Sequence, residues 1–301
     1  MVRKMKIHPI EQLPPGVNNQ GLFSDYYLTE LVWDDEFFRE AAKQAESIWH
    51  AIKELYDDVK DQLPTANEAQ TEQLFIRPVL NILGFEKLYG LQPPIPSPEG
   101  TRYPDFAFFP DRETLKEAEA NHKGKLEYFT KALAVGDAKQ WERSLDRRIK
   151  EAKAVFTNAN PSYQIDFYLR TTNKTWGILT NGRHWRLYHR DSSYRMNVFY
   201  EVDLVTMLEQ YDESFAYFYA FFCKEAFTTG FLDSALSGSR EYAVKLGDEL
   251  KENVYEALRL LAEGLLKCPE NGLSAKDLEE IRANTFVLIY RILFLFYAED
   301  R

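Results

Sequence analysis

Three residues have the side chains that metal-assisted hydrolysis of a phosphodiester bond requires: Asp105, Asp137 and Lys139. A divalent cation such as Mg²⁺ takes hard oxygen ligands from one or two carboxylates, polarises the phosphate and lowers the pKa of a bound water. A nearby ammonium stabilises the negative charge that develops when this water attacks. The sequence therefore offers a candidate hydrolytic site if the fold brings the three residues together.

Two short predicted strands carry these residues. Residues 103–109 form an aromatic run that ends at a proline, and residues 132–139 form a small apolar run that turns polar at its end. Side chains alternate between the two faces of a strand, so Asp137 and Lys139 lie on one face. Asp105 joins them only if the two strands are neighbours in a sheet.

The pattern of apolar residues predicts an α/β fold, a mixed sheet flanked by helices, with a helical N-terminal arm and an all-α C-terminal connector. We expect three parts, residues 1–64, 65–204 and 205–301. Asn181-Gly182 is a strong hairpin signal that joins strands 176–180 and 184–188. We also predict a strand over 165–169 and helices over 34–63, 65–84 with a kink at Pro78, 112–120, 145–156, 205–227, 241–266 and 275–301.

Pro104-Asp105 followed by Asp137-Ala138-Lys139 resembles the motif of the PD-(D/E)XK nuclease superfamily, and the predicted order of elements is similar to its αβββαβ core. In this core the first strand would be the one after Gly84. Further segments resemble the amino-terminal part of fused restriction-modification enzymes of Type IIG. These segments are residues 67–72, 75–78, 103–107, 137–141, 177–183 and 293–301.

The resemblance implies a Mg²⁺-dependent, site-specific DNA endonuclease that acts in defence against foreign DNA. Asp105, Asp137, the Ala138 carbonyl and Glu72 would bind the metal, Lys139 would assist the attacking water, and Gln140 would help to bind metal or phosphate. Glu68, one turn before Glu72, is the rival helix carboxylate. The resemblance also implies that a covalently linked adenine methyltransferase domain, which would use S-adenosylmethionine, and a target-recognition domain belong to the full-length protein.

The charge distribution bears on DNA binding. The net charge is −10, but residues 139–195 contain 12 Lys or Arg against 5 Asp or Glu, a net charge of +7. Basic side chains that contact the DNA backbone position DNA without reading its sequence. The candidates on the predicted helix after Lys139 are Arg143, Arg147, Arg148 and Lys150.

Other interpretations stay open. The main alternative is a catalytically silent DNA-binding or assembly module of a defence complex. Asn160-Pro161-Ser162-Tyr163 resembles the Asn-Pro-Pro-Tyr tetrapeptide of adenine methyltransferases, but no glycine-rich turn for the methyl donor precedes it, and we interpret it as a turn. Cys223 and Cys268 belong to no metal-binding pattern, and no signal peptide or apolar run of about 20 residues is evident, so we expect a cytoplasmic protein with no membrane partner.

Overall fold

The computed structural model describes residues 12–97, 100–146 and 160–299. Contacts divide the chain into two units, Met1–Ser239 and Arg240–Arg301. The sequence predicts a boundary at residues 204/205, whereas this division falls at 239/240. The later position arises because α7 (Leu204–Glu209), α8 (Phe215–Phe222) and α9 (Lys224–Thr228) contribute buried side chains to the core of the first unit.

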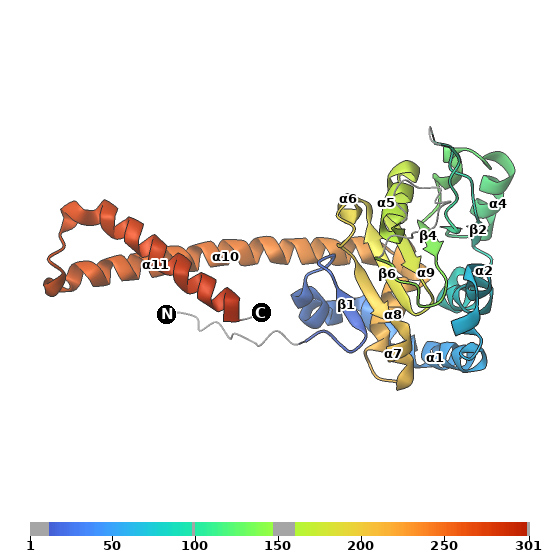
Figure 1. The fold of residues 1–301 in the computed structure, drawn as a ribbon, viewed down its shortest axis with the longest axis horizontal. Coiled ribbons are helices and arrows are strands. Elements are labelled where there is room, and N and C mark those ends of the chain that lie inside the picture. Colours follow the sequence, from blue (N-terminus) through green and yellow to red (C-terminus); the bar gives the residue numbers. More distant parts are fainter. Residues whose placement is uncertain (1–11, 98–99, 147–159, 300–301) are drawn as a thin grey trace. The chain divides into compact units, whose positions relative to one another are not determined.

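A mixed seven-stranded sheet forms the centre of the first unit, in the order β1-β7-β6-β5-β4-β3-β2 (Figure 1). Neighbouring strands are antiparallel except for β4 and β5, which are parallel. The strands are β1 (Val17–Asn19), β2 (Tyr89–Leu91), β3 (Phe106–Phe108), β4 (Ala134–Ala138), β5 (Trp176–Thr180), β6 (His184–His189) and β7 (Tyr200–Asp203). The predicted hairpin is confirmed, because β5 and β6 pair across Asn181-Gly182.

Alternate residues of the central strands enter different cores, as a period of two requires. On β4, Ala134 and Ala138 belong to one apolar cluster and Val135 to the other. On β3, Ala107 lies on the face of Val135. Asp105 and Asp137 are in phase with Ala107 and Val135, so strand alternation assigns both carboxylates to that face.

Helices pack against the sheet. The N-cap Asp35 accepts hydrogen bonds from the backbone N–H groups of Phe37 and Phe38 and so starts α1 (Glu36–Val59), which packs on α8. On the face of Val135, α5 (Pro161–Thr172) packs against β4 and β5 (Figure 1). The predicted charged helix is also present, as α4 (Arg112–Asn121).

The stretch before β2 is helical, as predicted, but it alternates between α-helical and π-helical turns. Its elements are α2 (Glu68–Thr71), η4 (Glu72–Ile76), α3 (Arg77–Leu80) and η5 (Asn81–Phe85). Pro78 lies where η4 passes into α3, directly after Arg77, whose N–H donates to the Glu72 carbonyl five residues earlier. The short remaining elements of this unit are η1 (Tyr27–Leu31), η2 (Val32–Asp34), η3 (Leu63–Thr65), η6 (Leu126–Phe129) and α6 (Arg190–Ser193).

Three predictions about helices and strands were wrong. The single helix expected over 205–227 is divided into α7, α8 and α9, because residues 210–214 and Cys223 are not helical. The strand expected over 165–169 is part of α5, because Asn160 caps a helix that has Pro161 in its first turn. The sequence predicts a non-helical stretch between the helices over 205–227 and 241–266, but residues 231–240, with Ser237-Gly238-Ser239, belong to the long helix α10 (Phe231–Lys267). Gly238 fits there because a Cβ atom would lie 2.9 Å from the Tyr27 ring, so the glycine allows close packing instead of ending the helix. Most of the helix predicted over 145–156 lies outside the described residues.

The second unit contains the distal part of α10, η7 (Pro269–Asn271), η8 (Ala275–Asp277) and α11 (Leu278–Glu299). Within the described residues α11 is the helix that is long and apolar enough, by length and composition, to cross a membrane. The sequence predicts no apolar segment long enough to cross a membrane, whereas α11 has 22 residues. Length and composition are shared by membrane-spanning helices and by helices buried in protein, so this finding assigns α11 to neither class.

Candidate active site

Asp105 and Asp137 lie opposite each other at one end of the β3–β4 pairing. Phe106 lies opposite Gly136 in the antiparallel register, and extending this register by one residue places Asp105 opposite Asp137. Asp105 Oδ2 accepts a hydrogen bond from the Ala138 N–H at 2.7 Å. The strand pairing on which the site depends is therefore present, and the Asp105 side chain holds the end of β4.

Lys139 lies two residues beyond Asp137 and pairs with it, as strand period two predicts. The ammonium forms an ion pair with Asp137 Oδ2 and donates a hydrogen bond to the Ala138 carbonyl at 2.9 Å. The side chains of Lys139 and Asp137 are only 7% and 3% exposed. Charges buried to this extent persist in proteins only when they are paired, so this pair dominates the local electrostatics.

Burial and like charge shift the protonation of the pair. Burial raises the pKa of the Asp137 carboxyl and the charge of Asp105 raises it further, while the Lys139 ammonium opposes this shift. Burial works against the charge of Lys139, but the carboxylates of Asp137, Asp105 and Glu68 outweigh it and raise the pKa of the ammonium. The site thus gathers carboxylates around one buried ammonium. Binding of a metal ion to such carboxylates would release protons from them.

Glu72 and Glu68 have different surroundings. Glu72 is buried, and its Oε2 accepts hydrogen bonds from Arg77 Nη2 at 2.8 Å and Nε at 3.2 Å. Burial raises the pKa of Glu72, and the nearby charge of Asp105 adds to that rise. Glu68 is half-buried, and its carboxylate lies 3.5 Å from Arg143 Nη1. Glu72 is therefore the helix carboxylate that is buried beside Asp105, although Arg77 occupies one of its oxygens.

Gln140 and Arg143 are turned towards the start of α2. The Gln140 side-chain amide donates to the Ala66 carbonyl at 3.0 Å, and Arg143 pairs with Glu68. Among the described residues, the Gln140 side chain forms no hydrogen bond with Asp105 or Asp137. Arg143 lies in a loop and not on a helix. The remaining predicted DNA contacts, Arg147, Arg148 and Lys150, lie outside the described residues.

Tyr168 belongs to this site although sequence reasoning did not select it. Its hydroxyl donates to the Tyr103 carbonyl at 3.0 Å, immediately before Pro104-Asp105. Burial raises the pKa of the Tyr168 phenol, and the charges of Asp137 and Asp105 raise it further. Tyr168 lies on α5. Because residues 165–169 were expected to form a strand, the sequence did not indicate that Tyr168 lies near Asp105.

The donor set at this site fits a hard divalent cation. Asp137 Oδ2 is buried and, among the described residues, has no hydrogen-bond partner beside its ion pair. Within the same residues no group of three or more His, Cys, Asp and Glu side chains is close enough to form a metal cage. Mg²⁺ does not require such a cage, because it keeps several waters and is bound through one or two carboxylates plus substrate phosphate.

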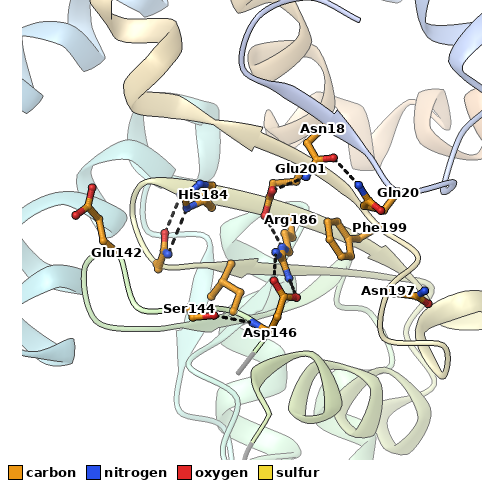
Figure 2. A pocket seen from close by; sticks show the side chains of 12 residues that line it. Asn18, Gln20, Glu142, Ser144, Asp146, His184, Arg186, Asn197, Phe199 and Glu201 are labelled. Carbon is orange, nitrogen blue, oxygen red and sulfur yellow. Dashed lines mark hydrogen bonds and ion pairs between the residues drawn. The ribbon is translucent and has the colours of Figure 1, made fainter. Parts of the chain in front are cut away.

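A separate pocket of about 500 Å³ is lined in part by Glu142, Ser144 and Asp146 (Figure 2). Its buried Arg186 binds both oxygens of Asp146 at 2.6 and 2.9 Å, pairs with Glu201 and stacks on Phe199 with 3.9 Å to the ring centroid. Asn18 donates to Glu201 at 2.8 Å. These groups satisfy one another, and three carboxylates line the pocket against one guanidinium, so the lining is unsuited to phosphate.

Comparisons with models of protein families, with curated proteins and with solved structures found no significant match for this chain.

Proposed function

We propose that this protein is a magnesium-dependent DNA endonuclease, the restriction part of a restriction-modification protein, with a PD-(D/E)XK site. The observation that carries the proposal is the buried Asp137–Lys139 pair at the end of β4, held by the Asp105 carboxylate from the neighbouring strand. The family's pattern requires this set of residue types in this chain order. The donors also suit a hard metal ion and a developing negative charge.

The order of elements supports the same proposal. A helical stretch precedes three consecutive antiparallel strands, β2, β3 and β4, and β5 then lies parallel to β4. A restriction-endonuclease-like αβββαβ core has this succession. The strand expected after Gly84 corresponds to β2. In such a core we would expect Asp105, Asp137 and Lys139 to form the catalytic site.

In the proposed mechanism the chain's residues divide the work. Asp105, Asp137 and the Ala138 carbonyl would bind Mg²⁺, and Glu72 would join them when Arg77 releases it. The bound ion would polarise the phosphate and acidify a water. Lys139 holds its ammonium beside Asp137 and the Ala138 carbonyl, where it can orient that water and stabilise the charge on the phosphate oxygens. Gln140 has a supporting role through Ala66.

The proposed substrate is double-stranded DNA, and the proposed location is the cytoplasm. Arg143 is 28% exposed and could exchange its partner Glu68 for a backbone phosphate. By the same family resemblance, the proposed partners are linked methyltransferase and target-recognition domains. The alternative is a silent DNA-binding or assembly module, in which the Arg77–Glu72 and Lys139–Asp137 pairs would serve only to fill the site.

A nicking assay on supercoiled plasmid with Mg²⁺ tests the proposal. We expect the parent protein to nick the plasmid and Lys139→Ala to be slower by about 10²- to 10³-fold, because one stabilising charge is lost. Lys131→Ala is the matched control, since Lys131 is exposed and, among the described residues, forms its ion pair with Glu117 on the surface. Equal rates for the parent and Lys139→Ala would remove Lys139 from the mechanism. A parent that binds DNA and leaves it intact would favour the silent module.

A further inference from the structure

The backbone around Lys139 is fixed at two points. The Lys139 N–H donates to the Thr180 carbonyl at 2.8 Å, which is the last hydrogen bond between the β4 end and β5. Two residues later the Trp141 N–H donates to Thr71 Oγ1 at 3.1 Å. Only Gln140 lies between these bonds, and its side chain is held by Ala66. The conformation of this segment therefore depends on a hydroxyl from α2.

The Thr71 hydroxyl has a fixed orientation. Thr71 is fully buried, and its Oγ1 donates to the Asn67 carbonyl at 2.9 Å. Asn67 is itself held in a capping box with Gln70, through two hydrogen bonds of 2.9 Å. Because its proton is directed at Asn67, the hydroxyl presents a lone pair to the Trp141 N–H. One side chain thus connects the start of α2 to the end of β4.

Packing holds the other end of this connection. The Trp141 ring stacks on Tyr56 at 6.2 Å and meets the edge of Phe75 at 5.6 Å. Gly182 lies against it, since a Cβ atom there would be 2.7 Å from the Trp141 ring, and its φ of +86° also favours glycine. The indole is therefore unable to follow the backbone if the Thr71 bond is lost, and the strain would fall on residues 139 and 140.

The connection also sets the distance between the helix carboxylates and the strand. Glu68 and Glu72 flank Thr71 in sequence, and the charge of Glu68 acts on both Asp137 and Lys139. We propose that Thr71 is a positioning residue for DNA cleavage, which aligns Lys139 with the carboxylates of the helix. This inference rests on the proposed nuclease function, because it assigns a role within that site.

Two substitutions separate the hydroxyl from the shape of the side chain. Thr71→Val keeps the shape and removes the hydroxyl, whereas Thr71→Ser keeps the hydroxyl. The matched control is Thr285→Val in α11, where a buried threonine makes a comparable bond to the Ile281 carbonyl at 2.6 Å. We would measure single-turnover plasmid nicking with Mg²⁺, DNA affinity with Ca²⁺, and hydrogen exchange of the Trp141 amide in each variant.

We expect Thr71→Val to slow nicking by about 10- to 100-fold, because small misplacements of catalytic groups have effects of that size. DNA affinity should stay unchanged, the Trp141 amide should exchange faster, and Thr71→Ser and Thr285→Val should behave like the parent. In a Lys139→Ala background, Thr71→Val should cause little further loss. Hydrogen exchange elsewhere in the chain serves as the folding control.

The outcomes are distinguishable. If the parent cleaves DNA and Thr71→Val cleaves at the same rate, the role of Thr71 is overturned and the nuclease function stands. If Thr71→Ser is as slow as Thr71→Val, the hydroxyl is not the cause and the role is also overturned. A parent that cleaves no DNA overturns the proposed function and this role together, and the exchange rate of the Trp141 amide then reports only on the fold.

Discussion

The Asp105 carboxylate, just before β3, accepts a hydrogen bond from the backbone N–H of Ala138, the residue between Asp137 and Lys139 at the end of β4. The bond is 2.7 Å long and buried. Asp105 therefore has a structural role in addition to supplying a charge, because the Ala138 N–H would otherwise be buried without a hydrogen-bond partner. The two roles can be separated by substitution.

Asp105→Asn and Asp105→Ala should differ in stability and agree in activity. The asparagine oxygen can still accept the Ala138 N–H, whereas alanine leaves that N–H unsatisfied, which should lower the free energy of unfolding by about 1–3 kcal/mol. Both variants lose the charge, and we expect both to lose Mg²⁺-dependent nicking. Urea denaturation and the plasmid assay check the two effects. Full activity in Asp105→Asn would mean that the charge of Asp105 is dispensable.

Arg77→Met should destabilise the protein more at pH 8 than at pH 5. Arg77 lowers the pKa of Glu72 against burial and the charge of Asp105, so its loss raises this pKa further. A carboxyl whose folded pKa lies above its unfolded pKa is neutral at low pH, and its contribution to stability is lost as the pH rises through the folded value.

We expect a loss of about 1–2 kcal/mol at pH 8, discounted because Arg77 is partly exposed, and a smaller loss at pH 5. Denaturation of the parent and Arg77→Met at both pH values, without divalent metal, measures this loss in the free energy of unfolding. Adding Glu72→Gln to Arg77→Met removes the buried charge and should restore much of the stability. An equal loss at both pH values would show that the charge of Glu72 is not involved.

Arg186→Met should affect stability without a matching effect on chemistry. Arg186 is buried and paired with Glu201, and removing one partner of a buried pair costs about 3–5 kcal/mol. The pocket that it lines contains none of the proposed catalytic groups. Thermal unfolding should show the loss, and the nicking rate per folded molecule below the transition should stay near that of the parent. A selective loss of nicking would assign this pocket a part in DNA cleavage.

Local patterns predicted part of the fold and site, and they succeeded where the physics is local. Asn181-Gly182 specified the β5–β6 hairpin through backbone geometry alone, and strand period specified that Asp137 and Lys139 share a face. Asp105 required the pairing of two strands separated along the chain, which the sequence could suggest through a family resemblance but not derive.

The features that were missed depend on tertiary packing. Residues 165–169 fit a strand by composition, and only the cap at Asn160 and the buried face of α5 favour a helix. Gly238 signals a break until its contact with Tyr27 is known. Thr71 and Tyr168 act through bonds to residues distant in sequence, so no spacing rule could have selected them.

The central claim is that Asp137 belongs to a metal-dependent DNA-cleaving site, and Asp137→Asn in the plasmid nicking assay tests it most directly. The side chain keeps its size but loses the charge that would bind Mg²⁺, while Asp191→Asn changes an exposed aspartate and serves as the control. We predict that the parent and Asp191→Asn nick plasmid with Mg²⁺ and stop when EDTA is added, and that Asp137→Asn yields no nicked product. Nicking by Asp137→Asn at the parent rate, or nicking that persists in EDTA, would contradict the account.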